Sequence, residues 1–210
     1  MNINLNSYFS KNLKILDYNI LSIGYLGSIG HPLYWIWWTF IDPQPFENIY
    51  IRLVGVVSCV LLILRNKWPL VLKKYFSCYW FFAIMYNCSF FFMVYTIDSG
   101  FSTLWTSLAF CSLYITIIMM QNYILFLLNY LLGVALAALF CYIKNPDLHL
   151  PDHEYFLYTY FPILGFAVVT GLIFDYGNKK GVIAQEKANI YKSLAGSIAH
   201  EIRNPLNTIN

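Results

Sequence analysis

Six long apolar stretches constrain the fold of this chain more than any other feature. A helix that crosses the hydrocarbon core of a bilayer needs about 20 predominantly apolar residues. Stretches of this kind, each ended by charged residues, Pro, Gly or Asn, cover 18–40, 49–64, 75–97, 101–120, 123–143 and 155–174. Only 11% of the 210 residues are charged, whereas an ordinary soluble domain has about 25%. The sequence therefore predicts an all-α integral membrane protein, with a six-helix transmembrane bundle in residues 1–175 and a cytoplasmic helix in residues 176–210.

The distribution of basic residues predicts how the bundle is oriented. Cytoplasmic segments of membrane proteins are enriched in Lys and Arg. With six spans, Arg52 and Lys144 fall on one side of the membrane, and the other eleven of the 13 basic residues fall on the opposite side. We therefore expect both termini to be cytoplasmic. Arg52 makes the 49–64 span the weakest of the six, and we expect its side chain to reach the lipid headgroups beside Tyr50.

The predicted spans contain few groups that could carry ions or hold a metal. A transporter or pump usually holds ionisable groups within the membrane, which disfavours that class here. His31 precedes Pro32 in the first span, where we favour a packing role in which the histidine satisfies backbone groups freed by the proline. His149 and His153 are four residues apart, but Pro151 between them favours a solvated turn over a metal site. The five cysteines all lie in apolar stretches and are interpreted as packing residues. We expect no bound metal.

Aromatic residues make up 20% of the chain and suggest what the bundle holds. Those near span ends fit the interfacial belt of membrane proteins, whereas others lie deep in the spans together with hydroxyl-bearing residues. A bundle lined by such side chains could hold a small apolar ligand that carries one or two polar groups.

Two patterns would let helices approach each other closely. Gly24, Gly27 and Gly30 recur at every third residue of the first span, which favours close packing either within one subunit or between two subunits. After Gly181 the chain becomes charged, and its apolar residues form one helical stripe suited to a partner helix. The stripe consists of Ile190, Tyr191, Leu194, Ala195, Ile198 and Ile202.

The end of the chain places a histidine beside an acid and just before a proline. At 100° per residue His200 falls opposite the apolar stripe, so we expect it to be exposed beside the helix contact. Pro205 lacks an N–H and its ring crowds the carbonyl of Glu201, so the helix should bend after His200. The Glu201 carboxylate can orient the imidazole and accept its proton when the ring acts as a nucleophile.

The stretch "AHEIRNPL" (199–206) resembles the H-box of bacterial sensor histidine kinases. The resemblance implies that His200 accepts a phosphoryl group from ATP and passes it to an aspartate of a response regulator. It also implies that Glu201 assists proton removal and that Asn204 positions water in the reverse phosphatase reaction. Pro205 matches the proline of that motif.

Three stretches further upstream are similar to the membrane region of the α-hydroxyketone quorum-sensing kinases, the LqsS/CqsS family, with the LqsS branch nearest. They are "PQPFEN" (43–48), "RNKWP" (65–69) and "TGLIFDYGN" (170–178). The resemblance implies a six-span sensor in the bacterial inner membrane that binds a small hydrophobic α-hydroxyketone. It implies a homodimer, with membrane lipid and a cognate response regulator or phosphotransfer protein as partners and no nucleic acid.

The same resemblance suggests which residues hold the ligand. Trp105 matches the pocket tryptophan of the family, and Ser107 matches its pocket serine after a one-residue slip; without a gap that position is Leu108. Phe166 matches a pocket aromatic, and Phe174 matches the position that helps set the length of the ligand tail. The departures from the family pattern imply a related ligand with different tail or headgroup contacts.

The small number of residues after His200 limits the activity that we expect of this chain. Ten residues cannot supply the nucleotide-binding domain that uses ATP and Mg²⁺ in these kinases, so we expect a sensor and phosphoacceptor fragment of a longer enzyme, inactive alone and binding neither. Two alternatives remain: a truncated, non-catalytic ligand-binding membrane protein, and less favourably a transporter.

Overall fold

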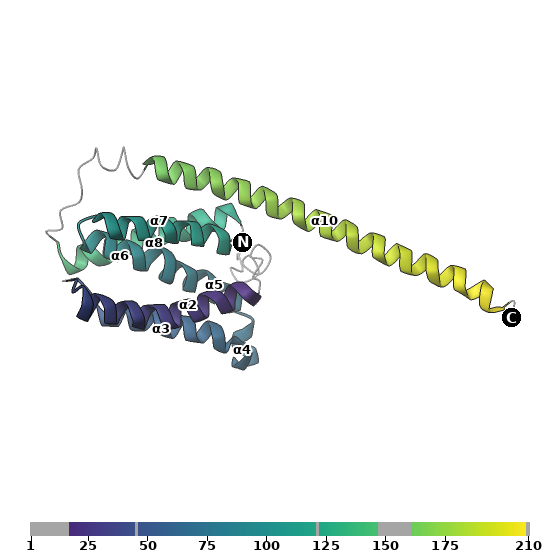
Figure 1. Cartoon of the computed structure of the whole chain (residues 1–210), viewed down its shortest axis with the longest axis horizontal. Helices are drawn as coiled ribbons and strands as arrows, with labels where there is room; N and C mark the ends of the chain where they lie inside the picture. Colours follow the sequence, from purple (N-terminus) through teal and green to yellow (C-terminus); the bar gives the residue numbers. More distant parts are fainter. Residues whose placement is uncertain (1–16, 45, 121, 147–160, 209–210) are drawn as a thin grey trace, which may run out of the picture.

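The computed structural model describes residues 17–44, 46–120, 122–146 and 161–208, and these residues form helices and connecting turns without any strand (Figure 1). The α-helices are α2 (Asp17–Ile36), α3 (Ile49–Ile63), α4 (Leu70–Lys73), α5 (Phe76–Ile84), α6 (Phe91–Asp98), α7 (Thr103–Met120), α8 (Tyr123–Lys144) and α10 (Phe161–Thr208). Three further segments are the π-helices η1 (Trp37–Ile41) and η3 (Met85–Phe90) and the 3-10 helix η2 (Leu64–Lys67).

The helices fall where the apolar stretches predicted them. Four helical segments are long and apolar enough to cross a membrane: Ile49–Lys67, Phe76–Asp98, Thr103–Met120 and Tyr123–Lys144. Their ends lie within a few residues of the second to fifth predicted spans. For the residues that the structure describes, the prediction of a helical membrane protein is confirmed. The count of six spans stays a prediction, because α2, which covers most of the first predicted span, is not among these four segments, and residues 155–160 of the last span lie outside the described part of the chain.

Small residues allow α2 to lie directly against α3. A Cβ atom added to Gly24 would lie 2.7 Å from Cγ1 of Ile63, and one added to Gly27 would overlap the sulfur of Cys59. The same addition at Gly30 would meet nothing within 4 Å. Of the two interpretations of this glycine series, contact within one chain is thus the one that the structure shows for Gly24 and Gly27.

The third predicted span, 75–97, is not a regular α-helix along its length. α5 and α6 are joined by the π-helix η3, in which the Asn87 side chain is buried. Nδ2 of Asn87 donates to the carbonyl of Ala83 at 2.8 Å and to Oγ of Ser58 on α3 at 2.7 Å. An amide side chain that competes for backbone carbonyls favours local departure from α-helical bonding, and such π segments are frequent at functional sites.

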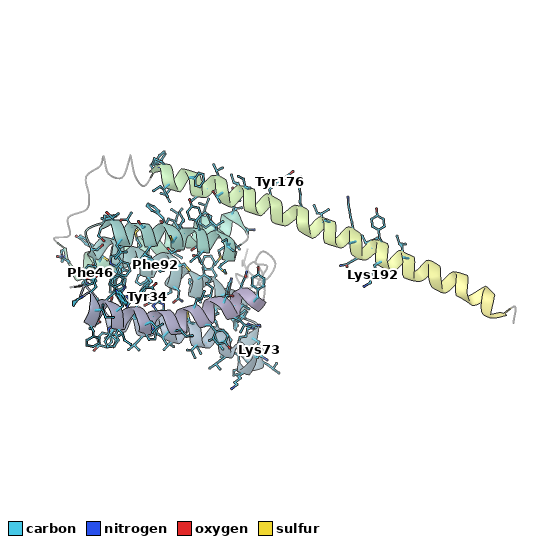
Figure 2. The ribbon with its side chains drawn as sticks, viewed as in Figure 1. Tyr34, Phe46, Lys73, Phe92, Tyr176 and Lys192 are labelled. Atoms are coloured by element: carbon cyan, nitrogen blue, oxygen red, sulfur yellow. The ribbon has the colours of Figure 1, made fainter. Side chains whose placement is uncertain are left out.

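Two buried apolar clusters stabilise opposite ends of the bundle. One is centred on Trp80, Phe81 and Leu113, and the other is centred on Tyr95 and Trp105. The cluster centred on Tyr95 and Trp105 lies at the end of the bundle that carries Phe46, and Lys73 lies at the opposite end (Figure 2). Turn residues Gly100 and Phe101, with φ of 63° and 61°, connect α6 to α7 at the Phe46 end.

The longest helix leaves the bundle. α10 has 48 residues, which corresponds to about 72 Å. Near its start it packs on α7 and α8, where Ala167 is 1% exposed and a Cβ on Gly171 would lie 3.5 Å from the Phe126 ring. It then continues alone past the end of the bundle (Figure 1). The helix runs through Pro205 to Thr208, so this proline does not end it.

Candidate functional site

A buried ion pair lies where α3 begins. Nη2 of Arg52 donates to Oε2 of Glu47 at 2.8 Å, and Nε of Arg52 donates to Oε1 of the same carboxylate. The side chains of Arg52 and Glu47 are only 4% and 6% exposed. The guanidinium carbon also lies 5.3 Å from the ring centroids of both Phe91 and Tyr95, where cation–π attraction adds to the pairing.

This arrangement corrects the expectation that Arg52 reaches the lipid headgroups. A charge in an apolar environment needs a partner. Glu47 supplies one from the turn before α3, where the Asn48 side chain accepts hydrogen bonds from the backbone N–H groups of Tyr50 and Ile51. The capped turn holds the carboxylate on the same side of the helix as Arg52, so the guanidinium folds back into the protein.

Tyr95 ties the ion pair to the neighbouring helices. Its hydroxyl donates to Oε1 of Glu47 at 2.9 Å and accepts from the backbone N–H of Asn48 at 3.3 Å. Its ring stacks on Trp105 of α7, with centroids 4.6 Å apart and planes 21° apart. The start of α3, the end of α6 and the start of α7 therefore meet at one buried tyrosine.

Trp105 lies in a box of aromatic rings. Besides Tyr95, the rings of Trp38 and Phe46 have centroids 5.9 and 6.1 Å from that of Trp105. Trp105 is 2% exposed, yet its Nε1 makes no hydrogen bond. A buried donor left unpaired costs about 1–3 kcal/mol. The box thus presents one free N–H inside apolar walls, which suits an oxygen acceptor on an otherwise apolar molecule.

The other predicted ligand residues lie elsewhere. Ser107 follows Trp105 by two residues, which is about 200° around the helix, and it is exposed with its hydroxyl donating to the carbonyl of Thr103 at 2.7 Å. Phe166 on α10 is 63% exposed, and its ring lies 6.4 Å from that of Tyr114, about 13 Å further along α7 than Trp105. Phe174 belongs to α10, and its side chain lies outside the described part. Among the described side chains, these residues do not gather around Trp105.

A second buried polar group sits in the middle of the bundle. His31 Nε2 lies 3.0 Å from Oδ1 of Asn87, and the Asn87 amide continues to Ser58 on α3. The His31 ring also packs edge-on against Phe91, with centroids 4.6 Å apart. His31 therefore hydrogen-bonds to a side chain of another span, which corrects the expectation that it satisfies backbone freed by Pro32. Since Phe91 contacts both His31 and Arg52, the two polar groups are neighbours.

Sequence reasoning missed most of this cluster. Phe46 and Glu47 lie in the "PQPFEN" motif, which was the available signal. Trp38 and Tyr95 lie near the ends of their predicted spans, where aromatic residues fit the interfacial belt, so the sequence did not single them out. Asn87 gave no signal, because a single amide in an apolar stretch does not reveal its partners.

The H-box residues lie in the last turns of α10. His200, Glu201 and Asn204 fall within this continuous helix, and their side chains lie outside the described part. Residues four apart on a helix share one face, so the backbone places His200 and Asn204 one turn apart. Within the residues that the structure describes, no three His, Cys, Asp or Glu side chains form a potential metal site.

The long apolar helices indicate a membrane protein, and comparison with known proteins finds a similar sequence. No protein family and no solved structure matches the chain. The chain is similar to the CAI-1 autoinducer sensor kinase/phosphatase CqsS of Vibrio cholerae serotype O1, with 28% identity over 191 residues. The similar region covers 91% of this chain and 27% of that relative, so the chain spans about a quarter of the relative's length.

Proposed function

We propose that this chain is the sensor and phosphoacceptor part of a membrane histidine kinase in a two-component quorum-sensing system. The observation that carries the proposal is the 28% identity to CqsS over 91% of the chain. The H-box resemblance of residues 199–206 supports the same class. The parent enzyme would be a homodimer of the LqsS/CqsS type, and a response regulator or phosphotransfer protein would receive its phosphoryl group.

In this proposal the protein crosses the bacterial inner membrane six times, with both termini in the cytoplasm. α2, which has 20 residues, would be the first span, and the start of α10 would complete the last one. The distribution of basic residues supports this orientation. The end of α10 then lies in the cytoplasm, where ATP and response regulators are found.

The ligand would be a small hydrophobic α-hydroxyketone. The free N–H of Trp105 suits a ketone or hydroxyl oxygen, and the rings of Trp38, Phe46 and Tyr95 suit the attached carbon chain. Ser107, Phe166 and Phe174 enter the proposal by resemblance alone. Since Ser107 and Phe166 lie apart from Trp105, their contribution would require either a second contact region or a rearrangement of helices on binding.

The phosphoryl chemistry would take place at His200. An imidazole nitrogen attacks the γ-phosphorus of ATP, whose Mg²⁺ and binding domain belong to the parent enzyme, and ADP leaves. Glu201 accepts the imidazole proton, and Asn204 positions water for phosphatase activity. α10 would carry the signal: Phe174 and His200 are 26 residues apart in one continuous helix, which is about 39 Å. Ligand must bind two helix arrangements unequally to shift this equilibrium.

The test uses the full-length parent protein in lipid vesicles with radiolabelled ATP. The wild-type protein should incorporate the radioactive phosphoryl group, and His200→Gln should not. A series of α-hydroxyketones should change the amount of label that the wild-type protein incorporates. Label that persists in His200→Gln would refute the phosphoacceptor assignment. Labelling that no α-hydroxyketone alters would refute the sensing assignment, and solute flux in the same vesicles would favour a transporter.

A further inference from the structure

An apolar groove lies at the end of the bundle opposite Phe46, where α3, η2, α4 and α5 meet. Its volume is about 740 Å³, which is within the range of about 300–1,000 Å³ typical of small-molecule sites. Leu61, Leu72 and Phe82 line it and are 39%, 50% and 47% exposed. The groove is therefore open at the surface of the bundle.

The walls of the groove are apolar because their polar atoms are bonded to α3. Nε1 of Trp68 donates to the carbonyl of Leu61 at 3.2 Å, and the hydroxyl of Tyr79 donates to the carbonyl of Ser58 at 2.7 Å. The rings of Trp68 and Tyr79 pack edge to face with centroids 4.9 Å apart. What remains for an occupant is aromatic and aliphatic surface, which suits a hydrocarbon chain.

The groove also carries positive charge. Lys67 lines it directly, and Nζ of Lys74 lies 4.8 Å from the ring centroid of Tyr75, another lining residue. Residues 64–75 contain four basic and no acidic residues. An occupant with a hydrocarbon chain and an anionic head complements both features. Basic pockets between spans are known places for anionic headgroups.

We propose that this groove binds an anionic glycerophospholipid of the surrounding bilayer, with one acyl chain along Trp68 and Tyr79 and the phosphate at Lys67 and Lys74. The proposal goes beyond the kinase assignment and does not depend on it, because neither His200 nor the Trp105 box takes part. The proposed site is one defined groove on the protein surface, in addition to the general lipid contact that any membrane protein has.

The test measures lipid binding by the delipidated full chain in mild detergent, using native mass spectrometry. Phosphatidylglycerol and phosphatidylcholine with identical acyl chains are compared. Each lysine near a lipid phosphate contributes about fivefold in affinity, so K67Q/K74Q should weaken phosphatidylglycerol binding about 25-fold. The matched control is K180Q, since Lys180 also lies 4.8 Å from a tyrosine ring, that of Tyr176 on α10. It should bind as wild type does.

A second variant tests the acyl chain. L72W fills the groove from a half-exposed position on α4, so it should lower phosphatidylglycerol binding at least tenfold while leaving thermal stability within a few degrees. Glycerol phosphate, which has the head without the tails, should not compete. The proposal is overturned if the two lipids bind equally, if K67Q/K74Q matches K180Q, if L72W binds as wild type does, or if glycerol phosphate displaces the lipid.

Discussion

Replacing Glu47 by glutamine should destabilise the protein strongly, because it leaves Arg52 charged and buried. Both side chains are at most 6% exposed, so solvent screening does not reduce their interaction. Removing one partner of a buried ion pair costs about 3–5 kcal/mol. Glutamine retains one oxygen acceptor and cation–π contacts remain, which favours the lower end, about 3 kcal/mol. For a chain of this size that corresponds to a fall of roughly 6–12 °C in Tm.

The assay is thermal unfolding of the purified chain in detergent, with two controls. Asp98→Asn breaks the pair with Lys144, whose side chain is 43% exposed, so it should cost at most about 1 kcal/mol. The double variant E47L/R52M removes both charges and should recover most of the loss, since apolar replacements of buried pairs are often neutral. If E47Q melts like D98N, Arg52 reaches water or lipid headgroups and the description of a buried pair is wrong.

Three further predictions follow from named contacts. Gly27→Leu should lower Tm by roughly 6 °C or more, because any Cβ at this position meets Cys59. Gly30→Ala should change Tm by less than about 3 °C, because a Cβ there meets nothing within 4 Å. Equal effects of the two substitutions in thermal unfolding would contradict the α2–α3 contact. Trp105→Phe keeps an aromatic ring in the stack but should weaken the response of the proposed full-length kinase to α-hydroxyketones about tenfold. An unchanged response would remove the indole N–H from the site. Four alanines inserted after Lys180 rotate the rest of α10 by about 40° and should abolish ligand control of His200 labelling; retained control would exclude rigid transmission.

The sequence located the helices well for a physical reason. Whether a stretch can cross a bilayer depends on its own composition, so the spans beginning near residues 49, 75, 101 and 123 could be predicted from local runs alone. The capping asparagines Asn48 and Asn122 fall just before the helices that they cap, which is also local information.

The contacts of the candidate site could not be predicted in this way. Arg52 looked like a residue near a membrane surface because its partner depends on how the turn before α3 is folded. His31 was assigned a backbone role because Asn87, 56 residues away, gave no sign of reaching it. Trp105 was found by resemblance, whereas its unpaired N–H became visible only with the side chains in place.

The π-helical segment η3 predicts how related sequences align with this part of the chain. Each π turn closes a bond one residue longer than an α turn, so the segment acts as a single-residue insertion that the helix has absorbed within the membrane. Before it, Trp80 and Phe81 face one core cluster, and after it, Phe91 and Tyr95 face the other. Relatives in which the segment matching Phe76–Asp98 is a regular α-helix should therefore align with a one-residue gap at residues 85–90, in the middle of a candidate membrane span and away from any loop.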